Sequence, residues 1–153
     1  MGTVHATCVA VESVGILLRG PSGSGKSDLA LRLIDGGASL VADDRVHLAP
    51  GEGDDSGAVV ARPPAALAGL LEVRGLGPVP VATVPSVRLG LVVDLRPGEP
   101  LERLPDPTSC AYLGVTLPLL QLDPFRPSAP AVLRLAVAAL RRADGHWPVA
   151  VDG

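Results

Sequence analysis

The chain has 153 residues, with 13 basic and 16 acidic side chains and a formal net charge of -3. That length fits one domain over residues 1–153, and such a chain buries about 70% of its unfolded surface, which is enough for a core. Hydrophobic residues make up 47% of the sequence, which excludes a disordered chain, and the slight acidity argues against a general nucleic-acid binder.

Charged residues, among them Arg32 and Arg134, interrupt every hydrophobic stretch before it reaches the roughly 18 residues that a membrane span needs. The N-terminus has no basic-then-apolar signal peptide, so we expect a cytoplasmic protein with no membrane partner. Cys8 and Cys110 have neither a CxxC motif nor the spacing of a zinc site. Both are expected to be small apolar residues of the core.

The predicted elements begin with a buried strand at 14–18, the loop 20–25 and a helix from Lys26 to about Asp35. A second strand is expected at 39–42, and an acidic, glycine-rich stretch at 50–57 is the best candidate for a mobile surface loop. Further strands are expected at 58–61, 71–74, 88–95 and 115–122. Ser128 is expected to cap a closing helix that runs to about Arg142. One strand–loop–helix unit followed mostly by strands predicts an α/β fold with a mixed sheet.

The loop before the first helix matches the phosphate-binding pattern G-x-x-x-x-G-K-S/T in full with Gly20, Pro21, Ser22, Gly23, Ser24, Gly25, Lys26 and Ser27. Backbone N–H groups of such a loop surround phosphate oxygens, and the helix N-terminus adds partial positive charge. Lys26, the only lysine of the chain, would reach the β- and γ-phosphates of a nucleotide, and the Ser27 hydroxyl would bind Mg²⁺. A GTPase would also need an N-K-x-D motif, but the chain contains no asparagine.

Two adjacent acids, Asp43 and Asp44, directly follow the strand expected at 39–42. Adjacent parallel strands would bring them to the phosphate-binding edge of the sheet. There, one carboxylate can organise metal-bound water while the other accepts the proton of an attacking hydroxyl. The alternative for Asp43 and Asp44 is a solvated turn with no catalytic role.

Glu72 and Arg74 share one face of a strand. They are either a metal ligand beside a phosphate-binding cation or a surface ion pair.

These motifs together resemble the catalytic domain of HPr kinase/phosphorylase. The resemblance rests on His5, the phosphate-binding loop, the run Leu-Val-Ala-Asp-Asp at 40–44 and the signature Glu-Val-Arg-Gly-Leu-Gly at 72–77. It covers residues 5 to about 80 well and the rest loosely, and it fits the short forms that consist of the catalytic domain alone. The fold that it implies is PEP carboxykinase-like, a P-loop-containing mixed twisted sheet flanked by helices. The implied assembly is a homo-oligomer, a hexamer.

The resemblance implies an ATP- and Mg²⁺-dependent kinase that phosphorylates a serine of the phosphocarrier protein HPr or of a nitrogen-branch paralogue. The proton-accepting aspartate of the family falls on Asp44, with Asp43 as a supporting acid. The active-site histidine falls on His5 and the second metal carboxylate on Glu72. A family arginine in a Y-D-R-L-G-like stretch aligns with Arg103, within Leu-Glu-Arg-Leu-Pro at 101–105.

The family's P-V-R-P-G-R-N segment appears at 124–130 as Pro-Phe-Arg-Pro-Ser-Ala-Pro. In the family this segment belongs to the reverse reaction, in which inorganic phosphate removes the phosphoryl group and pyrophosphate is released. Arg126 is retained and is expected, with Arg74, to support the phosphate site, whereas Ala129 replaces the second arginine. Phosphate would therefore be held there by fewer charge-assisted bonds.

Two alternatives come from other functional classes. A small-molecule kinase on the same loop would need a lid that closes over its substrate, and the acidic stretch at 50–57 is too short and too negative to close over an anion. A regulatory module that binds a nucleotide without turnover would have no use for the retained acids.

Overall fold

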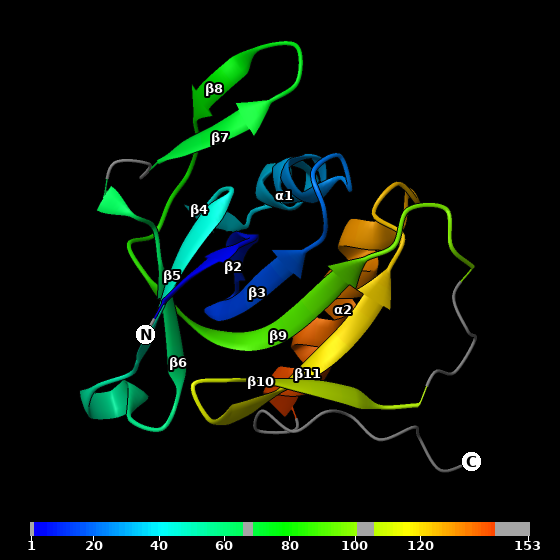
Figure 1. Cartoon of the computed structure of the whole chain (residues 1–153). Helices are drawn as coiled ribbons and strands as arrows, with labels where there is room; N and C mark the ends of the chain where they lie inside the picture. The colour runs from blue at the N-terminus through cyan, green and yellow to red at the C-terminus, as the bar shows by residue number, and fades with distance from the viewer. Residues whose placement is uncertain (1, 66–68, 101–105, 143–153) are drawn as a thin grey trace.

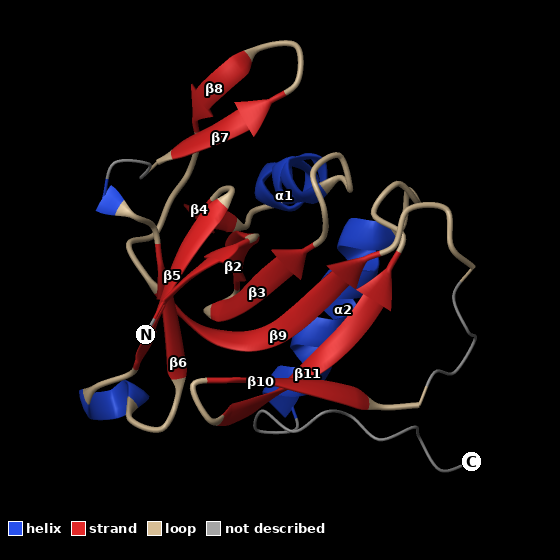
Figure 2. Cartoon of the chain, viewed as in Figure 1, coloured by secondary structure: helices blue, strands red, loops and turns tan. Residues whose placement is uncertain are grey.

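The computed structural model describes residues 2–65, 69–100 and 106–142 (Figure 1). The strands are β1 (Gly2–His5), β2 (Thr7–Val11), β3 (Val14–Arg19), β4 (Ser39–Ala42), β5 (Arg45–Pro50), β6 (Val59–Arg62), β7 (Leu70–Val73), β8 (Gly77–Pro80), β9 (Val87–Leu95), β10 (Thr108–Tyr112) and β11 (Val115–Leu122). The helices are α1 (Lys26–Asp35) and α2 (Ala129–Arg142), and a short 3-10 turn, η1 (Gly53–Asp55), connects β5 to β6 (Figure 2).

Nine strands form one sheet, whose main path runs in the order β1-β5-β6-β9-β3-β2-β4. The long strand β9 is parallel to β3 along one edge, and to β11 near its own C-terminal end. The pairs β1·β5, β5·β6, β6·β9, β2·β3, β2·β4 and β10·β11 are antiparallel. The mixed sheet predicted from the sequence is therefore confirmed.

The two faces of the sheet bury two different cores. One core contains the apolar sides of α1 and α2 with alternate residues of β2, β3 and β9. Both helices therefore lie on the same face, and α2 passes behind β9 and β11 in Figure 1. The other core lies between β2, β3 and β9 and the strands β5 and β6. Cys8 is fully buried in this second core, as expected, whereas Cys110 on β10 is only half-buried and packs against its edge.

The local predictions hold for the elements around the phosphate-binding loop. The first helix has the expected bounds, and β4 and β11 match the expected strands. Ser128 lies at the N-cap position of α2, because its carbonyl accepts the hydrogen bond of the Val132 N–H at 2.9 Å. The strands β1, β2, β5, β8 and β10 were not expected. The acidic stretch is the end of β5 followed by η1, and Asp55 there contacts Arg88 at 3.5 Å.

The prediction that adjacent parallel strands carry the loop and the two acids is wrong. The strands β3 and β4 are not neighbours, because β2 lies between them and is antiparallel to both. Glu12 and Ser13 form the two-residue turn from β2 into β3, with positive φ angles of 48° and 69°. Such a turn closes an antiparallel hairpin. The acids still reach the phosphate-binding edge, but from one strand further away.

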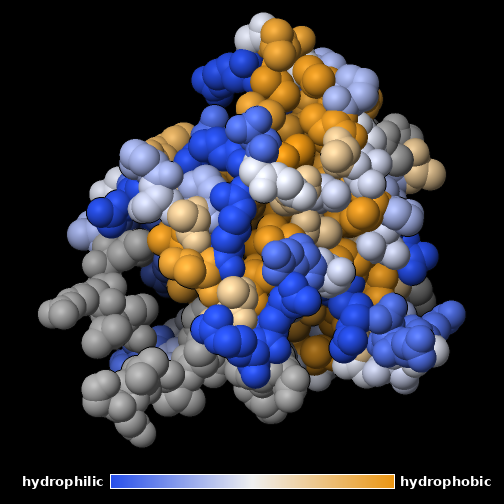
Figure 3. Space-filling view, turned by 180° about the vertical axis from the view of Figure 1, so that it is seen from behind, coloured by the Kyte–Doolittle hydropathy of each residue, from blue (hydrophilic) through white to orange (hydrophobic). Residues whose placement is uncertain are grey.

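The hairpin of β7 and β8 is a separate two-stranded sheet, which rises above α1 in Figure 1. Its side chains Leu70 and Leu76 are exposed, and Figure 3 shows apolar surface at this upper end of the molecule. Within the described ranges, no helix combines the length and the apolar composition that crossing a membrane requires.

Candidate functional site

The loop from Gly20 to Gly25 connects the end of β3 to the start of α1. Gly23 and Gly25 have φ angles of 83° and 95°, in the left-handed region that favours glycine. A Cβ on Gly25 would also lie 3.0 Å from the Phe125 ring. No side chain caps the N-terminus of α1, so its first N–H groups are available to an anion.

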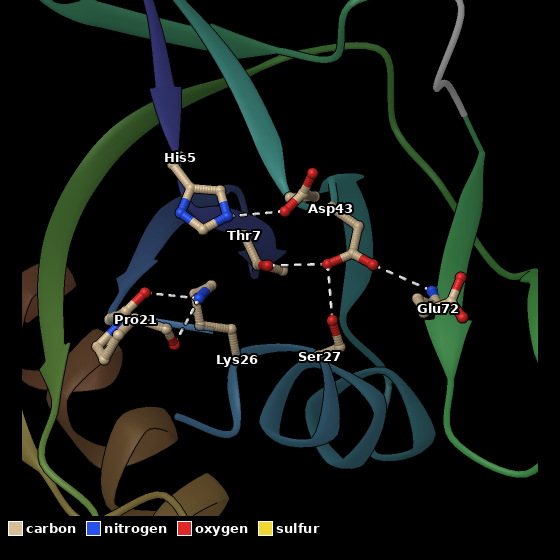
Figure 4. A network of polar contacts seen from close by, with 9 residues as sticks. His5, Thr7, Pro21, Lys26, Ser27, Asp43 and Glu72 are labelled. Carbon is tan, nitrogen blue, oxygen red and sulfur yellow. Dashed lines mark hydrogen bonds and ion pairs between the residues drawn. The ribbon is translucent and has the colours of Figure 1, made fainter. Parts of the chain in front are cut away.

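Lys26 points back over this loop (Figure 4). Its Nζ donates hydrogen bonds to the carbonyl oxygens of Gly20 at 2.6 Å and Pro21 at 3.1 Å. Burial lowers the pKa of Lys26, and the negative charges of Asp44 and Asp43 oppose that shift. The ammonium group is thus held among acceptors at the loop, where phosphate oxygens can replace the two carbonyls.

Asp43, directly after β4, is 9% exposed and accepts hydrogen bonds from three separate elements (Figure 4). Thr7 Oγ1 and Ser27 Oγ donate to its Oδ1 at 2.8 and 2.9 Å. The backbone N–H of Glu72 donates to its Oδ2 at 3.0 Å. The carboxylate is therefore held in one orientation between β2, α1 and β7.

Asp44 lies in a different environment, since 64% of its side chain is exposed. Its φ of 70° is unusual for a residue other than glycine and is tolerated best by Asp and Asn. Strained backbone of this kind is concentrated at functional sites. The Nε2 atom of His5 lies 2.8 Å from Asp44 Oδ1. An ionised carboxylate only accepts, so with Asp44 ionised the tautomer that fits this contact carries its proton on Nε2.

These groups surround one cavity of about 900 Å³, within the range of small-molecule sites. It is lined by His5, Thr7, Ser22, Gly23, Gly25, Lys26, Ser27, Asp28, Leu31, Asp43, Asp44, Leu70, Glu72, Val73, Arg74, Pro78 and Phe125. Glu72 and Arg74 both line it, and among the described residues no ion pair joins their side chains. The alternative of a surface ion pair between them is thus not observed.

Other expected residues lie outside this cavity. Arg126 is exposed and does not line it, although its carbonyl accepts a hydrogen bond from Arg32 at 3.4 Å. Ala129 is fully buried in the helix-side core. Arg103 lies outside the described residues.

Three residues of the phosphate-binding loop, Gly20, Pro21 and Ser24, do not line this cavity. Pro21 and Ser24 instead line a second cavity of about 320 Å³.

The donor set suits a magnesium ion that arrives with a nucleotide. In the described part of the chain, no group of three or more His, Cys, Asp or Glu side chains could hold a metal. Mg²⁺ commonly needs only one or two protein ligands beside phosphate oxygens and waters. Ser27 donates its proton to Asp43, which leaves the hydroxyl lone pairs free for a cation, and Glu72 lines the same cavity.

Two residues of the site were missed from the sequence. Thr7 is buried and donates a hydrogen bond to Asp43. The one feature of the sequence that could have indicated its role is its position two residues after His5. Phe125, the single phenylalanine of the chain, lies over the phosphate-binding loop. Its N–H donates to Asp123 Oδ1 at 3.0 Å, and Arg32 donates to the carbonyl of Pro124. Single-sequence patterns do not reveal such contacts between distant segments.

Comparisons with known proteins point to one family. Residues 1–122 match the family model described as HPr Serine kinase C-terminal domain. The chain is 35% identical over 148 residues to HPr kinase/phosphorylase of Geobacillus thermodenitrificans (strain NG80-2), covering 90% of the chain and 47% of that protein. It is 41% identical over 113 residues to HPr kinase/phosphorylase of Bordetella pertussis (strain Tohama I / ATCC BAA-589 / NCTC 13251), covering 67% of the chain and 36% of that protein. The chain thus spans less than half the length of these curated relatives.

A solved structure, that of the Hpr(Ser) kinase/phosphatase from Coxiella burnetii, has a similar fold. The two superpose with a TM-score of 0.80 at 25% sequence identity, over 95% of this chain and 100% of that chain. The fold similarity therefore extends beyond the residues that the family model matches.

Proposed function

The chain belongs to the family of HPr serine kinase C-terminal domains, and from this premise we propose that it is an ATP- and Mg²⁺-dependent kinase of a phosphocarrier serine. The observation that carries the proposal is one cavity lined by both the phosphate-binding loop and the Asp44–His5 pair. The protein partner is HPr or a nitrogen-branch paralogue. The enzyme acts in the cytoplasm and assembles as a homo-oligomer, a hexamer.

Asp44 serves as the general base. Its exposed carboxylate accepts the proton of the serine hydroxyl, while the serine oxygen forms a bond to the γ-phosphorus and the bond to the ADP oxygen breaks. His5 orients this carboxylate through the 2.8 Å contact. Asp43, with both oxygens already hydrogen-bonded, acts as the supporting acid instead.

The remaining groups stabilise the charge on the transferring phosphoryl group. Lys26 binds the β- and γ-phosphate oxygens, and Arg74 supplies a second cation in the cavity. Ser27 and Glu72 would hold Mg²⁺, which would neutralise charge on the phosphates. The N–H groups of the loop and of the start of α1 orient the phosphate chain.

The reverse reaction uses the same groups. A protonated Asp44 returns its proton to the serine oxygen as inorganic phosphate attacks phosphoserine and pyrophosphate forms. Arg126 lies outside the cavity and Ala129 is buried. Among the described residues, the basic side chains of Lys or Arg that line the cavity are therefore those of Lys26 and Arg74. We therefore expect weak phosphate affinity and a reverse reaction slower than the kinase reaction.

The test incubates the protein with ATP, Mg²⁺ and a phosphocarrier of the HPr type, and maps the phosphorylated residue by mass spectrometry. Asp44→Asn should abolish serine phosphorylation, whereas Asp54→Asn, at an exposed carboxylate in η1 away from the cavity, should leave it unchanged. Lys26→Ala should abolish turnover while circular dichroism shows an intact fold. Excess inorganic phosphate, added afterwards, measures the reverse reaction through pyrophosphate release.

Each outcome has a distinct meaning. ATP binding without phosphorylation of any phosphocarrier would contradict the proposal and favour a small-molecule kinase or a regulatory module. Thermal-shift measurements with ATP and candidate acceptors separate those two, since only a true substrate stabilises further or is consumed. An Asp44→Asn variant with full activity would remove the general base assigned above. An unfolded Lys26→Ala variant would make that lysine structural.

A further inference from the structure

Thr7 is a fully buried residue with a hydroxyl at the edge of the nucleotide cavity. It begins β2, whose next residue, Cys8, pairs with Ala42 at the end of β4. This register places Thr7 beside the residue that follows β4. The result is the 2.8 Å hydrogen bond from Thr7 Oγ1 to Asp43 Oδ1.

Two hydroxyls share the Oδ1 atom of Asp43, because Ser27 Oγ donates to it at 2.9 Å. A carboxylate oxygen has two lone pairs, so Thr7 and Ser27 together use the hydrogen-bonding capacity of Oδ1. Thr7 comes from the sheet and Ser27 from the first turn of α1. The position of the Ser27 hydroxyl therefore depends on a carboxylate that Thr7 fixes from the opposite side.

A serine that ligates a metal must turn its lone pairs, and not its proton, toward the ion. Ser27 does so only while its proton is donated to Asp43. Thr7 is well suited to holding Asp43 in place, because a β-branched side chain has few χ1 rotamers and this one is fully buried. Groups that orient a metal ligand from behind in this way commonly affect metal affinity strongly.

We propose that Thr7 is a positioning residue that holds Asp43 so that the Ser27 hydroxyl presents its lone pairs to nucleotide-bound Mg²⁺. This inference rests on the proposed function, which supplies the metal and the nucleotide. Thr7 acts through Asp43, to which its hydroxyl donates a hydrogen bond. Its contribution is the orientation of two side chains before the metal arrives, so that less orientational freedom is lost on binding.

The test is a calorimetric titration of ATP at increasing Mg²⁺, and again in EDTA. Thr7→Val removes the hydroxyl with little change of shape. It should raise the Mg²⁺ concentration for half-maximal enhancement of ATP binding about 10-fold, while the affinity for metal-free ATP stays the same. Thr7→Ser keeps the donor and should restore the wild-type Mg²⁺ dependence. Thr108→Val loses a hydrogen bond of the same 2.8 Å length on β10 and should change neither quantity.

The controls distinguish the two hypotheses. If the ATP affinity of the wild-type protein does not depend on Mg²⁺, that result contradicts the proposed function before any variant is made. With a normal wild type, a normal Mg²⁺ dependence in Thr7→Val would overturn the inference alone. So would a Thr7→Val variant that loses ATP affinity equally with and without Mg²⁺, since that pattern indicates a distorted cavity. If Thr7→Val does not fold, Thr7→Cys, a weaker donor, is measured in its place with the same expected direction and the same overturning results.

Discussion

At the scale of single residues, the two adjacent carboxylates differ sharply in environment. Asp43 is 9% exposed and receives three hydrogen bonds, whereas the side chain of Asp44 is 64% exposed and contacts only His5 among the described residues. Asp44, with its positive φ, lies in the turn between β4 and β5, whereas Asp43 is enclosed by Thr7, Ser27 and Glu72. In the proposed mechanism, Asp43 therefore organises the site and Asp44 exchanges a proton with the substrate.

Cys8 provides a pH-dependent prediction. Burial raises the pKa of its thiol far above the ordinary value of 9.0, so the folded protein keeps the proton that the unfolded chain loses above about pH 9. The free energy of unfolding should therefore decrease as pH rises past that value, by about 1.4 kcal/mol per pH unit for this one proton. Urea unfolding at several pH values measures the slope.

The Cys8→Ala variant has no thiol proton at this position, so its dependence of unfolding free energy on pH is the comparison for the wild-type slope. It should show a flatter decrease at alkaline pH, while its lower overall stability, caused by the cavity it creates, does not affect the slope. Cys110→Ala is the comparison variant: burial also raises the pKa of Cys110, but this thiol is only half-buried, so its removal should flatten the decrease less than Cys8→Ala does. Identical slopes in wild type and Cys8→Ala would show that Cys8 ionises in the folded state.

At the scale of elements, α1 is held at both of its ends. Its N-terminus borders the phosphate-binding loop and the ring of Phe125. Its C-terminal turn receives Arg134 of α2, whose Nη2 donates to the Leu33 carbonyl at 3.1 Å. A side chain at Gly36 would occupy the space that this guanidinium fills. The two helices are thus connected by a cation at the negative end of the α1 dipole.

We expect Arg134→Met to reduce the free energy of unfolding by about 1–2 kcal/mol, because a half-buried carbonyl loses a charged donor. Urea denaturation at pH 7 is the measurement. Arg141→Met is the matched control on the same helix, since it breaks only the exposed 2.6 Å ion pair with Glu12. Its effect should stay below about 1 kcal/mol. Equal losses in the two variants would contradict a special role for the Arg134 contact.

At the scale of the whole molecule, the site is assembled from segments that are far apart in sequence. The parallel pairing of β11 with β9 carries the segment after β11 to the phosphate-binding loop and α1. Arg32, in the last turn of α1, donates hydrogen bonds to the carbonyls of Pro124 and Arg126. On the outer face of α2, Leu135 is 71% exposed and Val132 is also exposed. Figure 3 views the molecule from this helix side.

If the chain forms the proposed homo-oligomer, we expect a second copy of the chain to contact the outer face of α2. Leu135→Glu should disrupt assembly, because it places a charge where an apolar contact would be desolvated. Light scattering coupled to size-exclusion chromatography, at several protein concentrations, measures the mass. Leu113→Glu, at an exposed leucine in the turn between β10 and β11, is the control and should leave the mass unchanged. An unaffected oligomer in Leu135→Glu would exclude this face as the interface.

Local signals in the sequence were sufficient for the phosphate-binding loop and the helix after it. Glycine spacing, a preceding apolar run and the lysine are all contained within about a dozen neighbouring residues, where backbone preferences decide the structure. The strands β3, β4, β6, β7, β9 and β11 were also found, whereas β2 was missed although its residues are almost all buried. The strand β1 was missed because it lies at the edge of the sheet and is mostly exposed, and β5 was missed although its buried residues alternate with less buried ones.

The sequence by itself determined that a phosphate-binding loop precedes α1 and that two acids and a Glu–Arg signature accompany it. Only the tertiary structure decided that β2 separates β3 from β4, that Asp43 is buried while Asp44 is exposed, and that Thr7 and Phe125 belong to the site. The physical reason is that strand order and side-chain hydrogen bonds depend on contacts between distant segments. Their energies come from burial in the folded chain, which no local pattern records.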